Sequence, residues 1–207
     1  MNTSKLLLAT ALAAVVSTPA FAGKADVGKT YVKLSGGAFI AEDINGTVGA
    51  TNVNLSFKTG WTIAGGVGYW ITPELAAEGE VTYLTADFDK GTAGGSSVNI
   101  DGTYESVLTM ANVNFHPMAD DSFDPYIGAG IGAAFSNLDV KSIGGTSVNI
   151  SDDSTDLALQ GTAGFNFALD QSTSVGAQYR YVWTDTGGSG TDNFTGHALT
   201  AHITINF

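Results

Sequence analysis

The strongest constraint on the fold is a strict alternation of apolar and polar side chains that recurs in eight segments of the chain. A period of two residues is typical of β-strands, in which neighbouring side chains point to opposite faces. The last segment shows the pattern clearly, because residues 199–207 alternate up to the final phenylalanine. The eight predicted strands are 30–41, 60–72, 74–87, 103–116, 125–137, 155–169, 173–184 and 196–207.

Residues 1–22 have the pattern of a cleaved secretory signal peptide. Lys5 supplies a positive charge, residues 6–16 form an apolar run, and Ala-Phe-Ala at 20–22 fits a cleavage site. The apolar run is shorter than the roughly 20 residues that a membrane-spanning helix needs. The sequence therefore predicts an exported protein with a single domain at 23–207.

Composition narrows the fold class and the partners. The chain has 27 glycines, 4 prolines and no cysteine, and no capped pattern with the helical period occurs. We therefore predict an all-β domain without disulfide bonds. The formal net charge of −12 argues against nucleic acid as a partner, because a surface that binds phosphates needs positive charge. No pattern indicates a cofactor or a metal.

Alternation alone leaves two architectures open, a soluble sandwich with its polar faces in water and a membrane barrel with its polar faces inside. The connections favour the barrel, because short links alternate with long links rich in Gly, Ser, Thr and Asn. The short links lie at 72–74 and 169–172, and a moderate one lies at 118–124. This rhythm is typical of membrane barrels, with short periplasmic turns and long outer loops.

Aromatic residues mark both ends of the predicted strands. Such rings are typical of a lipid-facing surface, because amphipathic side chains favour the level of the lipid headgroups. If odd-numbered strands run upward, the predicted girdles are Trp61, Tyr83, Phe135 and Trp183 at the upper rim, and Tyr69, Phe115, Phe167 and Phe207 at the lower rim.

The even number of strands allows the last strand, 196–207, to pair with the first, 30–41. Closure leaves no sheet edge, which hydrocarbon requires because each unpaired backbone group there costs several kcal/mol. The sequence thus predicts an all-β, membrane-spanning, eight-stranded antiparallel up-and-down β-barrel.

Several motifs resemble a known family. Residues 110–115 (MANVNF), 124–132 (DPYIGAGIG) and 177–182 (AQYRYV), with the terminal aromatic, are similar to the eight-stranded outer-membrane barrels of Gram-negative bacteria. This family includes the OmpA-type transmembrane domain and the opacity-like proteins often labelled porin family. The resemblance covers the whole chain after the signal and implies a location in the cell outer membrane. It implies little about activity, and no periplasmic domain is expected after the barrel.

The resemblance also implies partners. Phe207, preceded by Ile205 and Ile203, looks like the C-terminal signal that the β-barrel assembly machinery reads, so deletion of Phe207 is expected to impair insertion. The membrane partners are expected to be outer-membrane lipid and lipopolysaccharide. A host or matrix ligand is expected at the outer loops, and the protein is expected to be a monomer.

Three long loops contain a near-repeated phrase, GATNVNLS at 49–56, GGSSVNID at 94–101 and GGTSVNIS at 144–151. The paired glycines of SIGGTS predict a two-residue hairpin turn, because such turns need positive φ. One interpretation is that the hairpins simply continue above the membrane. The other is that they form β-ribbons that touch a partner. The central residues of the repeats are Val53, Asn54, Val98, Asn99, Val148 and Asn149.

Four charged side chains are predicted to face the lumen, namely Lys33, Glu78, Glu80 and Arg180. An eight-stranded barrel is just wide enough for its side chains to fill, and a buried charge without a partner is costly. We therefore predict that Arg180 pairs with at least one of the two glutamates and that the network plugs the lumen. A proton or ion path is the alternative.

Other candidate sites have weaker patterns. Three histidines are too scattered to suggest a metal site: His116, His197 and His202. The loop acids at 151–156 lack the spacing of an EF-hand. The glycines at 128–132 mimic a nucleotide-binding fingerprint, but they lie inside a predicted strand. We expect them to make room for large lumenal side chains, namely Trp70, Tyr126 and Arg180.

The sequence therefore predicts a structural and surface-interaction protein that is not an enzyme and whose lumen is closed. A narrow porin-like channel for ions or small solutes is the first alternative, and a lipid-modifying enzyme that uses His197 and a loop serine is the second. A channel of the OmpW-like subtype would, by resemblance, need an apolar lumen. The inward charges Glu78, Glu80 and Arg180 argue against that subtype.

Overall fold

The structure, a computed structural model, describes residues 27–48, 51–119, 121–185 and 193–207. The predicted signal peptide lies outside these residues. No helix in the described part is long and apolar enough to cross a membrane. The described strands are β1 (Thr30–Ala41), β2 (Ile44–Val48), β3 (Thr51–Phe57), β4 (Gly60–Trp70), β5 (Leu75–Ala93), β6 (Ser96–Phe115), β7 (Phe123–Ile143), β8 (Thr146–Ala168), β9 (Thr173–Asp185) and β10 (Phe194–Asn206).

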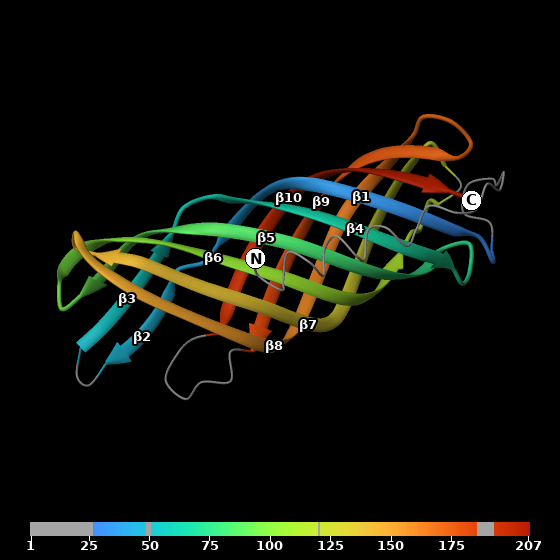
Figure 1. Ribbon diagram of the computed structural model, residues 1–207. Helices are drawn as coiled ribbons and strands as arrows, with labels where there is room; N and C mark the ends of the chain where they lie inside the picture. The colour runs from blue at the N-terminus through green and yellow to red at the C-terminus, as the bar shows by residue number, and fades with distance from the viewer. Residues whose placement is uncertain (1–26, 49–50, 120, 186–192) are drawn as a thin grey trace.

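Eight of these strands form a closed antiparallel ring in the order β1, β4, β5, β6, β7, β8, β9 and β10 (Figure 1). The seam between β1 and β10 runs from Tyr31 opposite Asn206 to Ala41 opposite Gly196. The alternating pattern at the end of the chain is therefore the strand that closes the barrel. The predicted eight-stranded barrel is confirmed.

The two ends of the barrel differ in the length of their connections. At one end, here called the turn end, short links join β4 to β5, β6 to β7 and β8 to β9, and the C-terminus lies beside them (Figure 1). At the other, the hairpin end, β5 to β8 run on well beyond the predicted strand limits. Two glycine pairs reverse the chain there, and their φ values are 56° and 83° at Gly94–Gly95 and 59° and 80° at Gly144–Gly145.

The extended arms form one continuous sheet at the hairpin end. The β2–β3 hairpin joins it, because β3 pairs with the upper part of β5 from Val53 opposite Ala93. This hairpin sheet consists of β2, β3 and residues 88–93, 96–103, 138–143 and 146–156 of β5 to β8. The three repeated phrases begin β3, β6 and β8, so each forms the returning arm of a hairpin.

The side chains of the ring strands divide cleanly between the two faces. Outward residues are apolar and open, as in Leu199 at 65% exposure and Ile127 at 62%, whereas inward Arg180 is 1% exposed. This assignment of faces agrees with the period of two in the sequence. The barrel therefore presents a hydrocarbon-compatible outside around a filled interior.

Candidate functional site

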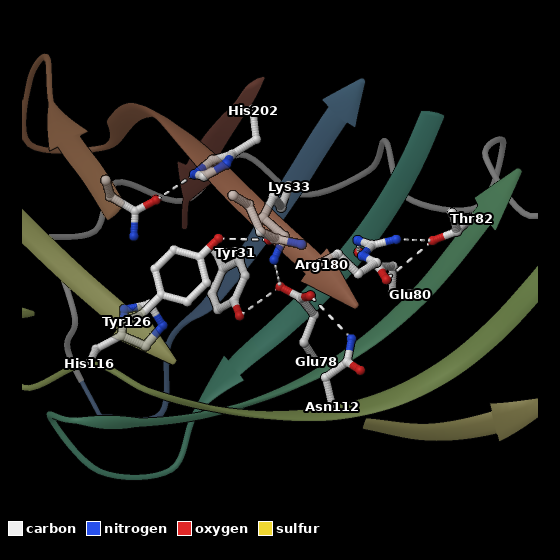
Figure 2. A network of polar contacts seen from close by, with 12 residues as sticks. Tyr31, Lys33, Glu78, Glu80, Thr82, Asn112, His116, Tyr126, Arg180 and His202 are labelled. Atoms are coloured by element: carbon white, nitrogen blue, oxygen red, sulfur yellow. Dashed lines mark hydrogen bonds and ion pairs between the residues drawn. The ribbon is translucent and has the colours of Figure 1, made fainter. Parts of the chain in front are cut away.

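The centre of the lumen contains two ion pairs (Figure 2). Arg180 on β9 lies with Nη2 2.5 Å from Glu80 Oε2, and its Nη1 donates to Thr82 Oγ1 over 2.8 Å. Lys33 on β1 lies with Nζ 2.8 Å from Glu78 Oε2. The structure thus brings together the four charges that the sequence assigns to the inward face, and it divides them into two pairs. Pairing offsets the desolvation cost of each buried charge.

Neutral side chains complete the hydrogen bonds of the two glutamates. Tyr31 donates its hydroxyl to Glu78 Oε2, the oxygen that Lys33 contacts, over 2.9 Å, and Asn112 donates to Glu78 Oε1 over 3.5 Å. Gln160 on β8 donates to Glu80 Oε1 over 3.3 Å and to Asn112 Oδ1 over 2.6 Å. These bonds connect β1, β5, β6 and β8 across the lumen. The network therefore cross-links opposite walls of the barrel.

A second polar group lies nearer the turn end. His116 Nδ1 is 2.8 Å from Asp124 Oδ2, and Asn166 donates to the same oxygen over 2.8 Å. His202 Nε2 lies 2.7 Å from Asn166 Oδ1. A cavity of about 30 Å³ beside this group is lined by Lys33, Trp70 and Asp124 among others, enough for one or two water molecules. No cluster of three or more metal-ligating side chains occurs in the described chain.

The lumen towards the hairpin end is apolar, a feature that the sequence reasoning missed. Phe57 of β3 closes this end, with its ring 5.0 Å from Phe88 and 6.1 Å from Phe194. The buried cluster behind it comprises Phe39, Ala41, Leu84, Ala86, Phe88, Tyr104, Leu108, Met110, Ala134, Ala158, Val182, Phe194 and Ala198. The sequence of β5 could have predicted this apolar half, because its inward residues change from Glu78 and Glu80 to Leu84 and Phe88 along one strand.

The glycines of β7 make room for smaller side chains than we expect from the sequence. A Cβ on Gly128 would lie 2.1 Å from Asn114 Oδ1, and one on Gly130 would lie 1.9 Å from Asn112 Oδ1. A Cβ on Gly132 would meet the backbone oxygen of Thr109. The expectation that these glycines accommodate Trp70, Tyr126 and Arg180 is therefore wrong. Close packing of β6 against β7 explains them instead.

The predicted girdle residues lie on the outward face near the two ends of the strands. Trp61 and Tyr83 contact each other with ring centroids 5.2 Å apart, and Phe135 and Trp183 lie on the same half of the barrel. At the turn end, Tyr69, Phe115 and Phe167 are each about half exposed. Phe207 follows β10 and donates its N–H to Thr30 over 2.8 Å, while Ile203 and Ile205 point outward from β10.

The loop-repeat residues lie in the hairpin sheet without converging on one point. Asn54 donates to Asn45 across the β2–β3 hairpin over 2.9 Å. The carbonyl of Asn99 accepts the N–H of Gly144 over 2.9 Å, which joins the tip of the β7–β8 hairpin to β6. Val53, Val98, Val148 and Asn149 also lie on these arms. The repeats therefore extend and connect the hairpins.

A polar cluster on the outside of the barrel is another feature that the sequence reasoning missed. His197 on β10 lies with Nε2 2.8 Å from Glu42 Oε1 and with Nδ1 2.6 Å from Tyr179 Oη. Thr195 donates to the second oxygen of Glu42. The hydrogen bonds from Thr195 and His197 lower the pKa of the Glu42 carboxyl below its usual value. The sequence alone does not predict this cluster, because Glu42 lies more than 150 residues from His197 along the chain.

Comparison with known proteins identifies the fold and the family. The family described as outer membrane protein beta-barrel domain matches residues 8–207. No curated protein matches the chain. Three solved structures share the fold at low sequence identity.

Neisserial surface protein A (NspA) has a TM-score of 0.54 and 18% identity, over 86% of this chain and 97% of its own. Ail, the attachment invasion locus protein of Yersinia pestis, has a TM-score of 0.54 and 13% identity, over 88% and 100%. The outer membrane protein OprG from Pseudomonas aeruginosa has a TM-score of 0.57 and 12% identity, over 90% and 98%. The location is thus the outer membrane, and the chain belongs to the outer membrane protein β-barrel domain family.

Proposed function

We propose that this protein is a structural and surface-interaction protein of the outer membrane, in which the hairpin sheet binds an extended polypeptide by strand addition. The observation that carries the proposal is an edge of β8 that no described strand covers. Pairing between β8 and β9 begins only at Leu157 opposite Asp185. Residues 146–156 of β8 therefore pair with β7 on one side and with no described strand on the other.

An open strand edge is a ready template for another chain, because its backbone groups are available for a new ladder. Natural proteins often protect such an edge with charged side chains, especially lysine, with proline or with a β-bulge. Residues 146–156 contain no lysine or proline; they carry three aspartates, and their register against β7 shifts once, between Ser147 and Ile150. The edge is a run of 11 strand residues. An edge of this length supports a partner segment of similar length.

The charge on this arm favours a basic partner. The β7–β8 part of the hairpin sheet carries Asp139, Asp152, Asp153 and Asp156 against one cation, Lys141. Ail has been solved in complex with the heparin analogue sucrose octasulfate, which is an anionic ligand. That structure has a TM-score of 0.51 and 14% identity to this chain. The acidic arm here is unsuited to a polyanion. We propose a host or matrix polypeptide with lysine- or arginine-rich extended segments as the partner.

The remaining parts of the proposal concern the membrane. Outer-membrane lipid and lipopolysaccharide would surround the apolar outside, the β-barrel assembly machinery would read Phe207, and the protein would act as a monomer without enzymatic activity.

The filled lumen argues against a narrow channel, because Arg180, Gln178 and the apolar cluster occupy it. Planar-bilayer recording of the purified protein tests this point, and stable conductance steps above leak would contradict a closed lumen.

Two synthetic probes test strand addition, an eight-residue peptide that alternates valine with lysine and one that alternates valine with glutamate. Fluorescence anisotropy with the barrel in detergent micelles should detect binding of the lysine peptide only. A variant that lacks residues 139–142 and 147–151 keeps Leu138 opposite Asp152 and Ile143 opposite Thr146. It shortens the edge from 11 residues to six, and so it should weaken binding. The double variant Asp152→Lys, Asp153→Lys should weaken the lysine peptide about fivefold to tenfold.

The matched control is Asp121→Lys, which adds a positive charge at the turn end and should leave binding unchanged. Equal binding of both peptides would contradict a role for the acidic arm. Binding of unchanged strength in the shortened variant would contradict the edge itself.

A further inference from the structure

Residues 150–156 form the part of the β8 edge that lies nearest the barrel. They pair with β7 without a register shift, from Val140 opposite Ile150 to Ala134 opposite Asp156. Side chains of a strand alternate between the two faces of a sheet. A strand added to this edge would therefore place every second side chain on the lumenal face and the others on the outer face.

Four residues of this edge lie on the face that continues the wall of the lumen. The next residue on that face is Ala158, which is fully buried in the apolar cluster, and the period of two extends the face upward from it. These lumenal residues are Ile150, Asp152, Ser154 and Asp156. Asp153 lies on the outer face, where Asn137 donates a hydrogen bond to its Oδ1 over 2.8 Å.

The lumenal row at Ser154 favours a cation. Ser136 lies opposite Ser154 and donates a hydrogen bond to Ser106 over 3.0 Å, so the row is polar across three strands. A side chain added opposite Ser154 would have Asp152 and Asp156 as diagonal neighbours about 7–8 Å away, within reach of a long side chain. Ser154 donates to Asp156 Oδ2 over 2.7 Å and so holds that carboxylate beside the position. Two flanking carboxylates favour lysine or arginine there.

The lumenal row at Ile150 favours an apolar side chain. Val140 lies opposite Ile150 and packs against the apolar cluster of the lumen. Gly102 continues the row on β6, where a Cβ would lie 3.0 Å from the ring of Phe88. Ile150 ends the row with 49% of its surface exposed. An apolar side chain opposite Ile150 would remove part of that surface from water, which is favourable.

We propose that this edge recognises an antiparallel segment that carries lysine or arginine opposite Ser154 and an apolar side chain opposite Ile150. The two recognition residues of the partner are then four positions apart, with the basic one nearer its N-terminus. Antiparallel pairing continues the arrangement of β7 and β8 and is the more stable of the two ladders. The inference rests on the proposed strand addition and deepens it, because it specifies the register and direction of the partner.

Three fluorescent nine-residue peptides of identical composition test the register, with threonine at seven positions. The matched peptide has lysine third and isoleucine seventh, the reversed peptide exchanges the two, and the off-face peptide has lysine third and isoleucine sixth. Fluorescence anisotropy with the barrel in detergent micelles should show about threefold to fivefold tighter binding of the matched peptide than of either other peptide.

Equal affinities of the three peptides, or a preference for the reversed or off-face peptide, would overturn the inference and leave strand addition in place. Binding of the valine–lysine peptide but of none of these three would do the same. Failure of all these peptides to bind would overturn strand addition and the inference together.

Variants of the barrel test each recognition position. Asp152→Asn and Asp156→Asn should each weaken binding of the matched peptide about twofold to threefold, and Ile150→Ser should abolish its advantage over the off-face peptide. Asp153→Asn is the matched control, because it removes the same charge from the outer face, and it should leave binding unchanged. An equal loss in Asp153→Asn and Asp152→Asn, or an advantage that survives Ile150→Ser, would overturn the inference.

Discussion

The two halves of the lumen are filled by opposite chemistry. Towards the turn end, buried charges and amides form a cross-linked network around Glu78, Glu80 and Arg180. Towards the hairpin end, aromatic and aliphatic side chains pack together under Phe57. Each half fills the same narrow bore. One half depends on partners for each charge, and the other depends on close packing.

This difference predicts how each half responds to damage. A polar network is sensitive to loss of one partner, because the charge left behind stays buried. An apolar cluster is sensitive to loss of volume, because a cavity remains. Removing a charged partner in the polar half and removing side-chain volume in the apolar half should therefore distinguish the two sources of stability.

The largest effect is expected at Arg180. Arg180→Leu leaves Glu80, which is 4% exposed, without its cation. The free energy of unfolding should fall by about 3–5 kcal/mol. Urea titration of the barrel in lipid vesicles, followed by tryptophan fluorescence, measures the change. The double variant Arg180→Leu, Glu80→Gln should recover part of the loss, since no lone charge remains.

An unchanged midpoint in Arg180→Leu would mean that the ion pair does not stabilise the barrel. A double variant no more stable than the single one would mean that lost packing, and not a stranded charge, causes the effect.

Leu108 tests the apolar half. Its side chain is 1% exposed in the cluster at the hairpin end. Leu108→Ala should cost about 3 kcal/mol through the cavity that it leaves. Leu108→Met conserves volume and should cost less than about 1.5 kcal/mol. The same urea titration measures both, and equal losses for the two variants would contradict a packing mechanism.

The fold was predictable because the alternation is visible strand by strand, and the inward orientation of each lumenal charge followed from it. The apolar half was not predicted, although Leu84 and Phe88 occupy the same inward face as Glu80. Assigning the apolar residues of each strand to its outward face conceals a strand such as β5, whose inward face becomes apolar in its upper part. The predicted strands are shorter than β5 to β8 at the hairpin end, because polar, glycine-rich arms have the sequence pattern of loops.

Most contacts between distant residues could not be predicted from the sequence. Alternation places His197 outward, but only the register between β1 and β10 brings Glu42 beside it. The sequence predicts that Arg180 pairs with one of the two glutamates, but the choice of Glu80, and of Glu78 for Lys33, depends on the stagger of the strands around the ring. A period of two fixes the face of a residue and leaves its height in the barrel open.

A smaller effect is expected above both halves, at the hairpin tip. Gly144 has a φ of 59°, which an L-residue adopts at a cost. Gly144→Ala should therefore destabilise the β7–β8 hairpin by about 1 kcal/mol. Hydrogen exchange of the amides in 138–152 measures the local loss. Gly161→Ala is the control, since a Cβ there meets nothing within 4 Å, and an equal effect of both substitutions would contradict the turn argument.

The smallest effect is expected at Glu42, which makes polar contacts on the outside of the hairpin half. The pKa of this carboxyl is lower in the folded protein than its usual value, which is about 4.3 in an unfolded chain. Its stabilising contribution is therefore complete above that usual value and is lost as the pH falls through the lower folded pKa. Because Glu42 is exposed, the contribution should stay below about 1 kcal/mol. Urea midpoints of wild type and Glu42→Gln should differ at pH 7, and the difference should shrink as the pH falls below the usual value of the carboxyl pKa; a difference that does not change with pH would show that the carboxylate charge is not what holds this end of β1 to β10.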